Sequence, residues 1–124
     1  MTPEAREAAV VLSGVERTFD LAGGRSVRAL DGVDLEVPSG SVTVLAGPSG
    51  SGKTTLLNVV AGLDRPTGGS VRVLGTDLAA LDDDEATRWR RRSVSSIFQA
   101  RGLVGHLTAL ENVDLALRLV GVGD

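Results

Sequence analysis

The sequence contains no cysteine and very few aromatic residues. Without cysteine the chain can form neither a disulfide nor a thiolate metal site, which fits a reducing compartment. Phe19, Trp89 and Phe98 are its only aromatic side chains. A hydrophobic core must therefore be built from valine, leucine and alanine.

Two further absences concern positive charge and long apolar runs. The net charge of −3 argues against general binding to nucleic acid or to anionic membranes. No stretch approaches the roughly 18 apolar residues that a bilayer crossing needs, and residues 1–9 lack the apolar core of a signal peptide. We therefore expect a cytoplasmic protein, and its 124 residues correspond to a single domain.

Lysine is also scarce, because Lys53 is the only lysine among the 13 basic residues, and it lies in a glycine-rich loop. The loop fits the phosphate-binding pattern G-x-x-x-x-G-K-[ST] at every fixed position. Its residues are Gly47, Pro48, Ser49, Gly50, Ser51, Gly52, Lys53 and Thr54. Glycines let the backbone turn so tightly that successive N–H groups point at one anion. Lys53 would add charge for the β- and γ-phosphates, and Thr54 a hydroxyl for a bridging Mg²⁺.

The segments on both sides of the loop have the character that this pattern requires. Residues 41–46 are β-branched and mostly apolar, as in a strand that is buried on both faces. Residues 55–61 predict a helix that ends at Gly62, and Pro66 prevents its continuation. The alternative is a chance match in a Gly/Ser-rich turn, and the strand–loop–helix context argues against it.

The rest of the chain predicts further strands and two polar helices. Before the loop, a small antiparallel sheet is expected, with a turn at Asp31-Gly32 between its second and third strands. Acidic residues at the start and arginines at the end of the first polar helix suit the helix dipole, and we interpret this basic end as solvated surface. Thr108 and Glu111 form a capping box at the start of the second. The expected strands are 8–15, 26–30, 33–37, 70–74 and 93–98, and the helices are 82–92 and 108–120.

These segments together resemble the nucleotide-binding domain of ATP-binding-cassette (ABC) transporters. The similarity lies in residues 33–40, in the loop itself, in the turn at 61–69, and in Ile97-Phe98-Gln99 followed by 107–113. It covers nearly the whole chain, and it is greatest with the lipoprotein-release and macrolide-export branch. Gly105 stands where the family pattern has proline, so we expect the loop that touches the membrane subunit in this family to be more mobile here.

The resemblance implies an α/β fold. It would be a P-loop NTPase (RecA-like) core, incomplete, with an N-terminal antiparallel β subdomain. Residues 1–124 would be the N-terminal part of an ABC-type ATP-binding domain. The phosphate loop would be 47–54, the Q-loop would begin at about residue 99, and a helical subdomain would begin at about 108–120.

The resemblance also assigns roles to residues outside the loop. Phe19 would stack on the adenine of ATP, although a core phenylalanine at a strand end is the plainer interpretation. Gln99 would contact Mg²⁺ and position the attacking water, so Thr54 and Gln99 would be the metal-binding residues. Thr55 would join the loop in binding the nucleotide. His106, the only histidine, receives no chemical role.

Several motifs of the family's second half do not occur in these 124 residues. There is no Walker B aspartate with its catalytic glutamate, no Leu-Ser-Gly-Gly-Gln signature and no switch histidine. We expect the first half of an ABC ATPase, inactive alone, that would work with a transmembrane permease subunit and a second nucleotide-binding domain at the inner face of the membrane. Two alternatives are a non-catalytic nucleotide-binding or docking fragment and, less well supported by the early sheet, a small kinase.

Overall fold

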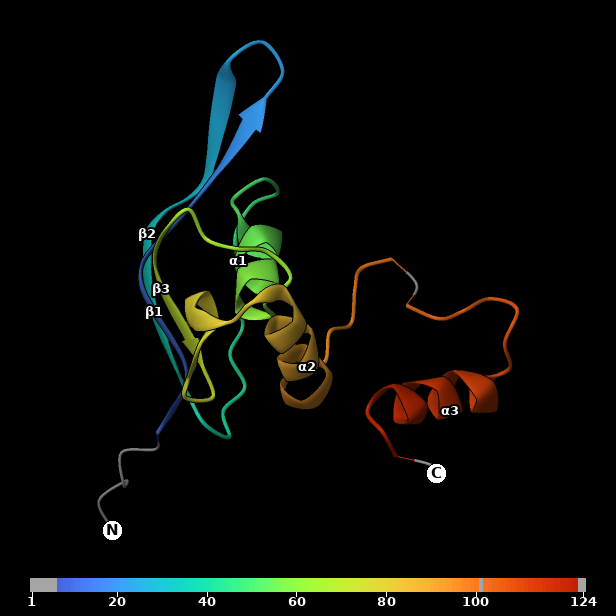
Figure 1. Ribbon diagram of the computed structural model, residues 1–124. Coiled ribbons are helices and arrows are strands. Elements are labelled where there is room, and N and C mark those ends of the chain that lie inside the picture. The colour runs from blue at the N-terminus through green and yellow to red at the C-terminus, as the bar shows by residue number, and fades with distance from the viewer. Residues whose placement is uncertain (1–6, 101, 123–124) are drawn as a thin grey trace.

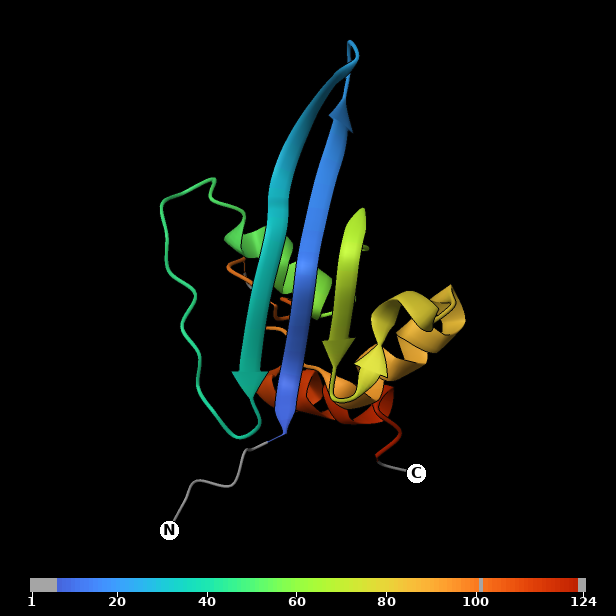
Figure 2. The ribbon, with the colours of Figure 1, turned by 90° about the vertical axis from the view of Figure 1, so that its left-hand side faces the viewer.

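The computed structural model describes residues 7–100 and 102–122 and shows an antiparallel sheet with helices on one face (Figure 1). The strand order is β2-β1-β3-β4, and every neighbouring pair is antiparallel. Seen from the sheet side, α1 lies behind the strands and α2 stands to the side of β3 (Figure 2). The elements are β1 (Ala8–Leu21), β2 (Arg25–Pro38), α1 (Lys53–Val60), β3 (Gly68–Val73), β4 (Thr76–Asp77), the 3-10 helix η1 (Leu78–Ala80), α2 (Asp83–Ser93) and α3 (Ala109–Leu119).

β1 and β2 form one long hairpin, which confirms the antiparallel sheet that the sequence predicts before the loop. The predicted turn at Asp31-Gly32 is wrong, because β2 runs through these residues without a break. Val15 pairs with Val33 and Arg17 with Leu30, so a step of two residues in β1 faces a step of three residues in β2. Asp31-Gly32 therefore forms a β-bulge, in which Gly32 has a φ of +68°.

A second bulge, this time in β1, turns two residues that are three positions apart toward the core. Between Leu12 and Val15 the pairing with β2 shifts, and Gly14 in the bulge has a φ of +56°. The Gly14 N–H donates to the Asp34 carboxylate at 2.7 Å. Because the bulge breaks the period of two, Leu12 and Val15 are both buried, at 3% and 0% exposure.

The core lies between the sheet and α1 and is made of leucine and valine, in line with the scarcity of aromatic residues. Leu56 and Val59 of α1 are three positions apart, so they share the face that meets the sheet. Trp89 of α2 packs against this core from its edge. The buried hydrophobic side chains of the described part are Leu12, Val15, Leu30, Leu56, Val59, Val71 and Val73.

The helix predicted after the loop is confirmed as α1, and it ends at Gly62 as expected. Gly62 has a φ of +67°, and its N–H donates to the Val59 carbonyl at 3.1 Å. The Leu63 N–H donates to the Asn58 carbonyl at 2.8 Å. These two bonds form a Schellman motif, which satisfies carbonyls that the helix end leaves free.

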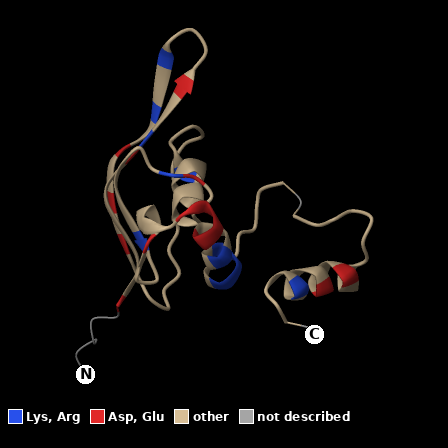
Figure 3. Cartoon of the chain, in the orientation of Figure 1, with Lys and Arg blue, Asp and Glu red and all other residues tan. Residues whose placement is uncertain are grey.

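Both later helices begin with a capping box, and their bounds agree closely with the predicted ones. The N-cap of α2 is Asp82, paired with Glu85, and the N-cap of α3 is Thr108, paired with Glu111. Acidic residues gather at the start of α2 and basic residues at its end (Figure 3). α3 lies apart from the sheet and from α1 and α2 (Figure 1).

Two predicted strands, 41–46 and 93–98, do not form. Residues 41–46 have no regular secondary structure and no strand pairing, and Val42 and Val44 are 96% and 83% exposed. Ser93 is the last residue of α2, and Ile97 in the extended segment that follows is fully exposed. A β-strand needs a neighbour for its backbone hydrogen bonds, and no other strand in the described ranges pairs with either segment.

Candidate functional site

The glycine-rich loop 47–54 leads directly into α1, so the free N–H groups of the helix start lie at the end of the loop. Gly50 and Gly52 have φ of +81° and +92°, a left-handed conformation that side chains disfavour. Gly52 is the residue that caps α1. Backbone of this kind and the positive end of a helix dipole together favour an anion.

The Lys53 ammonium is folded over the loop and donates three hydrogen bonds to it. Its Nζ lies 2.6 Å from the Gly47 carbonyl, 2.7 Å from the Pro48 carbonyl and 3.1 Å from Ser51 Oγ. Over the described ranges 7–100 and 102–122, no carboxylate forms an ion pair with Lys53. Its charge is therefore available to an anion, while its hydrogen bonds hold the loop around it.

Two glycines of the loop make close approaches, to a side chain at Gly47 and to the backbone at Gly52. A Cβ on Gly47 would lie 2.9 Å from Ser51 Oγ, and a Cβ on Gly52 would lie 2.5 Å from the Ala29 carbonyl oxygen. Ala29 is itself the extra residue of a third bulge, because Arg17 pairs with Leu30 while Thr18 pairs with Arg28. The hairpin thus places the carbonyl of Ala29, which lies in this bulge, in contact with Gly52, the last glycine of the loop.

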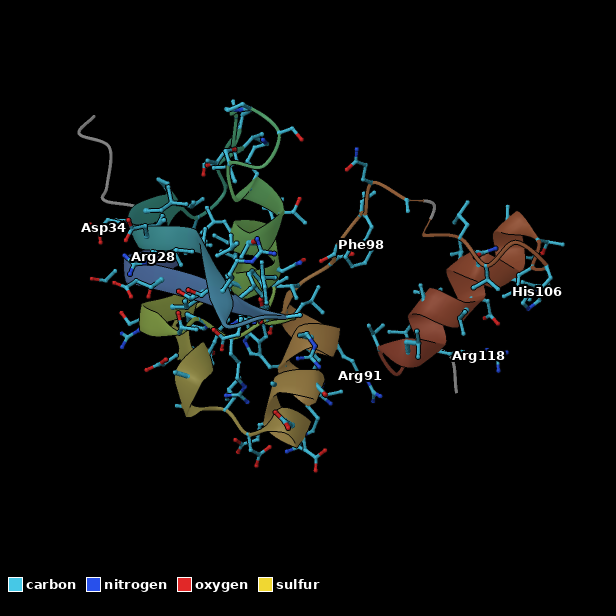
Figure 4. The ribbon with its side chains drawn as sticks, turned by 90° about the horizontal axis from the view of Figure 1, so that it is seen from above. Arg28, Asp34, Arg91, Phe98, His106 and Arg118 are labelled. Carbon is cyan, nitrogen blue, oxygen red and sulfur yellow. The ribbon has the colours of Figure 1, made fainter. Side chains whose placement is uncertain are left out.

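An open hollow of about 660 Å³ beside α1 brings Lys53 and Thr54 together with Gln99. The rest of its lining is largely apolar and includes Leu57 and Phe98. Phe98 lies on the segment that leads away from α2 toward α3 (Figure 4). The fold therefore gathers the two predicted metal-binding residues, which are far apart in the sequence, at one hollow.

A magnesium ion at this hollow would depend on few protein ligands. In the part of the chain that the structure describes, no three histidine, aspartate or glutamate side chains cluster as a metal site would require. Thr54 offers a hydroxyl and Gln99 an amide oxygen, both of which suit a hard cation. These donors fit Mg²⁺ held mainly by phosphate oxygens and water.

Phe19 lies near the end of β1, where it pairs with Val27 of β2, and it is 36% exposed. It is therefore no core residue, which removes the plainer interpretation of this phenylalanine. The Arg17 guanidinium stands over its ring, 4.2 Å from the centroid. Since Arg17 pairs with Leu30, and Leu30 lies against Gly52, the same stretch of hairpin carries Phe19 and borders the loop.

The remaining residues assigned by resemblance occupy ordinary positions. Pro48 and Ser49 lie on the exposed part of the loop, and Thr55 is half-buried in the first turn of α1. Gln99 is exposed. His106 is an exposed residue before α3 (Figure 4).

Sequence reasoning missed Ala29, Arg17 and Asp64. Arg17 Nε donates to Asp64 Oδ2 at 2.8 Å, which links β1 to the turn after α1. The only signal in the sequence was the spacing of Arg17 and Phe19, because residues two apart on a strand share a face. Nothing comparable marks Asp64, which lies 47 positions further along the chain.

Similarity to known proteins extends over most of the chain. The ABC transporter family model matches residues 30–122. The lipoprotein-releasing system ATP-binding protein LolD of Anaeromyxobacter dehalogenans is 55% identical over 104 residues, which are 84% of this chain and 43% of LolD. The macrolide export ATP-binding/permease protein MacB of Hahella chejuensis is 40% identical over 117 residues, 94% of this chain and 18% of MacB.

A solved structure gives the same result for the fold. The ATP-binding cassette MJ0796, in a dimeric post-hydrolysis state bound to ADP and Pi, superimposes with a TM-score of 0.85 at 41% identity. The match covers 93% of this chain and 49% of that one. The chain thus spans less than half the length of these relatives. No helix in the described part has the length and apolar character needed to cross a membrane.

The fold is therefore that of a P-loop NTPase, and residues 7–100 and 102–122 show its antiparallel subdomain, phosphate loop and α1 without paired parallel strands. With the family model matching most of its length, the chain belongs to the ABC transporter family.

Proposed function

We propose that this chain binds Mg-ATP at loop 47–54 as the N-terminal part of the ATP-binding subunit of an ABC transporter. The observation that carries the proposal is the loop itself. Gly50 and Gly52 turn the backbone with positive φ, α1 begins at Lys53, and the Lys53 ammonium has no acidic partner in the described ranges. These groups provide what a triphosphate needs, namely backbone donors, a helix N-terminus and a positive charge.

The other residues divide the remaining tasks. Phe19 offers its ring to the base, and Thr54 and Gln99 would hold Mg²⁺, which when bound neutralises charge on the β- and γ-phosphates. Gln99 lines the same hollow as Thr54 and would also orient the attacking water. Residues from about 99 would form the Q-loop, and α3 would begin the helical subdomain of a domain whose N-terminal part is 1–124.

The relatives support a proposal for the wider function. LolD and MacB are named for lipoprotein release and macrolide export, and MJ0796 is described as a dimer. We infer that this chain serves ATP hydrolysis coupled to export, with a transmembrane permease subunit and a second ATP-binding domain as partners. It would then lie at the cytoplasmic face of the membrane. A non-catalytic nucleotide-binding or docking role is the alternative, and it would leave ATP binding intact without turnover.

Isothermal titration calorimetry with MgATP tests the binding site through Lys53→Ala. This change removes the positive charge that would face the terminal phosphates and leaves every loop glycine in place, so we expect a loss of affinity of at least about tenfold. Arg118→Gln provides the control, because Arg118 pairs with Asp114 on α3 and is not part of the loop. Equal MgATP affinity in wild type and Lys53→Ala would contradict the assignment.

A further inference from the structure

Arg17 joins two parts of the molecule that the proposed function uses separately. Its Nε donates to Asp64 Oδ2 at 2.8 Å, in the turn that follows α1. Its Cζ lies 4.2 Å from the centroid of the Phe19 ring, so the guanidinium covers one face of that ring. Its Nη1 also donates to the Thr18 carbonyl at 3.1 Å. The planar group is thus fixed by contacts at its edge and over its face.

The ion pair between Arg17 and Asp64 is the most sheltered one in the described ranges. The two side chains are 21% and 24% exposed, whereas the partners in the other ion pairs are 51–98% exposed. Shelter from water strengthens a charged hydrogen bond and reduces its screening by salt. This pair is therefore suited to holding a side chain in place, which exposed pairs do poorly.

Asp64 is anchored in turn by the backbone around it. Its Oδ1 accepts from the Arg65 N–H at 2.9 Å, and its own N–H donates to the Asn58 carbonyl at 3.2 Å. The same turn is attached to β1 next to Arg17, because the Thr67 N–H donates to the Glu16 carbonyl at 2.8 Å. The guanidinium over Phe19 thus takes its position from the end of the helix that starts at the phosphate loop.

We propose that Arg17 is a positioning residue for the nucleotide base. It occupies one face of Phe19 and fixes the ring, so that the base of a bound nucleoside triphosphate stacks on the opposite face. Phe19 keeps 36% of its surface exposed, which leaves room for such a ligand. The attraction between the guanidinium and the ring also holds the ring against Arg17. This inference rests on the proposed function, since it concerns the base of the same ligand.

A ligand without a base separates this role from phosphate binding. We would measure affinities for MgATP and for magnesium tripolyphosphate by calorimetry in wild type, Arg17→Gln and Phe19→Ala. Arg17→Gln should weaken MgATP binding by about three- to tenfold, the size expected for a lost cation–π contact and its ordering effect. Its affinity for tripolyphosphate should stay unchanged, which also shows that the variant is folded. Arg17→Lys, which keeps the charge without the planar fork, should recover part of the loss.

Three further variants complete the test. Asp64→Asn should weaken MgATP less than Arg17→Gln, because it releases the guanidinium without removing it. In a Phe19→Ala background, Arg17→Gln should have no additional effect, as expected for residues that act through one another. Arg118→Gln is the matched control, because its Nε also donates to an aspartate, Asp114, at 2.7 Å. It should bind both ligands as wild type does.

Different results would overturn different claims. The positioning role is wrong if Arg17→Gln binds MgATP within about twofold of wild type, a change too small for a lost cation–π contact. It is also wrong if Arg17→Gln loses affinity for MgATP and for tripolyphosphate equally, since an equal loss indicates a structural role. A third contrary result is that Arg17→Gln still weakens MgATP binding in the Phe19→Ala background. Failure of the proposed function has another signature, namely that Lys53→Ala binds both ligands as well as wild type does.

Discussion

The carbonyl oxygen of Ala29 lies where a side chain on Gly52 would have to be placed, 2.5 Å from an ideal Cβ. Ala29 is the bulged residue of β2, and Gly52 is the N-cap of α1. The hairpin and the phosphate loop are therefore in direct backbone contact. This contact makes the conformation of the loop depend on the sheet, although the loop itself contains no strand.

The first prediction concerns Gly52→Ala. The new methyl group would force Ala29 and the loop apart, in addition to the strain of a φ of +92°. We expect a loss of about 2–4 kcal/mol in the free energy of unfolding, from positive-φ strain and overpacking together. Gly50→Ala is the control for strain alone, because Gly50 has a φ of +81° but nothing within 4 Å of its Cβ position. Thermal unfolding followed by circular dichroism would compare them, and equal melting temperatures would show that the contact has no effect.

A second glycine makes a similar contact within the sheet. A Cβ on Gly69 would lie 2.3 Å from the carbonyl oxygen of Gly14, in the bulge of β1 that turns Leu12 and Val15 inward. Gly69→Ala should therefore disturb the register between β1 and β3 and destabilise the fold by about 2–4 kcal/mol. Gly75→Ala, at a φ of +78° in open space, should cost only the strain of about 1–2 kcal/mol. Urea unfolding of both variants measures the difference.

The third prediction concerns pH and the start of α3. The Glu111 carboxylate accepts from the Thr108 N–H and hydroxyl, and these bonds lower the pKa of Glu111 below its ordinary value of 4.5. Because the pKa of Glu111 is lower in the folded than in the unfolded state, its contribution to stability is fully present at a pH above the unfolded-state pKa. That contribution is lost as the pH falls through the folded-state pKa. The start of α3 should therefore loosen below a pH of about 4.5, the unfolded value for this group.

An NMR titration of the Glu111 and Thr108 resonances would follow this change. Glu111→Gln is the matched control, because glutamine can complete a capping box but does not titrate. Its Thr108 amide signal should stay constant over the same range of pH. An unshifted titration of Glu111 in the wild type would mean that the capping box does not persist in solution.

The fourth prediction is that this chain alone hydrolyses ATP no faster than background. Among the described residues, no carboxylate lines the hollow shared by Lys53, Thr54 and Gln99, so none is placed to activate a water molecule there. Loss of such a group lowers turnover by about 10²–10⁴-fold. Phosphate release with a colorimetric assay tests this. Steady release that disappears in Lys53→Ala would show that the chain has a complete catalytic site.

The last prediction concerns segment 41–46. Val42 and Val44 are 96% and 83% exposed. The backbone of this apolar segment has no strand partner in the described part of the chain. Such segments promote association between copies, so we expect aggregation that increases with concentration. The double variant Val42→Lys with Val44→Lys should stay soluble at higher concentration in light scattering. Leu119→Lys, at an exposed site of α3, should not help, and a monomeric wild type with reversible unfolding would contradict the prediction.

The sequence alone predicted the features that depend on neighbouring residues. The phosphate loop, the stop of α1 at Gly62 and the capping box at Thr108 depend on residues within a few positions of the backbone groups involved. The capping box at Asp82 was found only in the structure. Scarce aromatic residues likewise indicated a core of valine, leucine and alanine, and the buried side chains of the described part are leucine and valine. Resemblance to ABC ATPases rested on these local motifs, and the family comparison agrees with it.

Only the tertiary structure decided the features that depend on distant partners. Segments 41–46 and 93–98 have strand-like side chains, but a strand forms only where another backbone supplies its hydrogen bonds. The bulge at Asp31-Gly32 resembles a turn because glycine with positive φ serves both, and the pairing with β1 selects the bulge. Arg17 meets Asp64 across 47 positions because β1 lies beside the turn after α1. No local pattern encodes that contact, since it arises from the packing of the helix on the sheet.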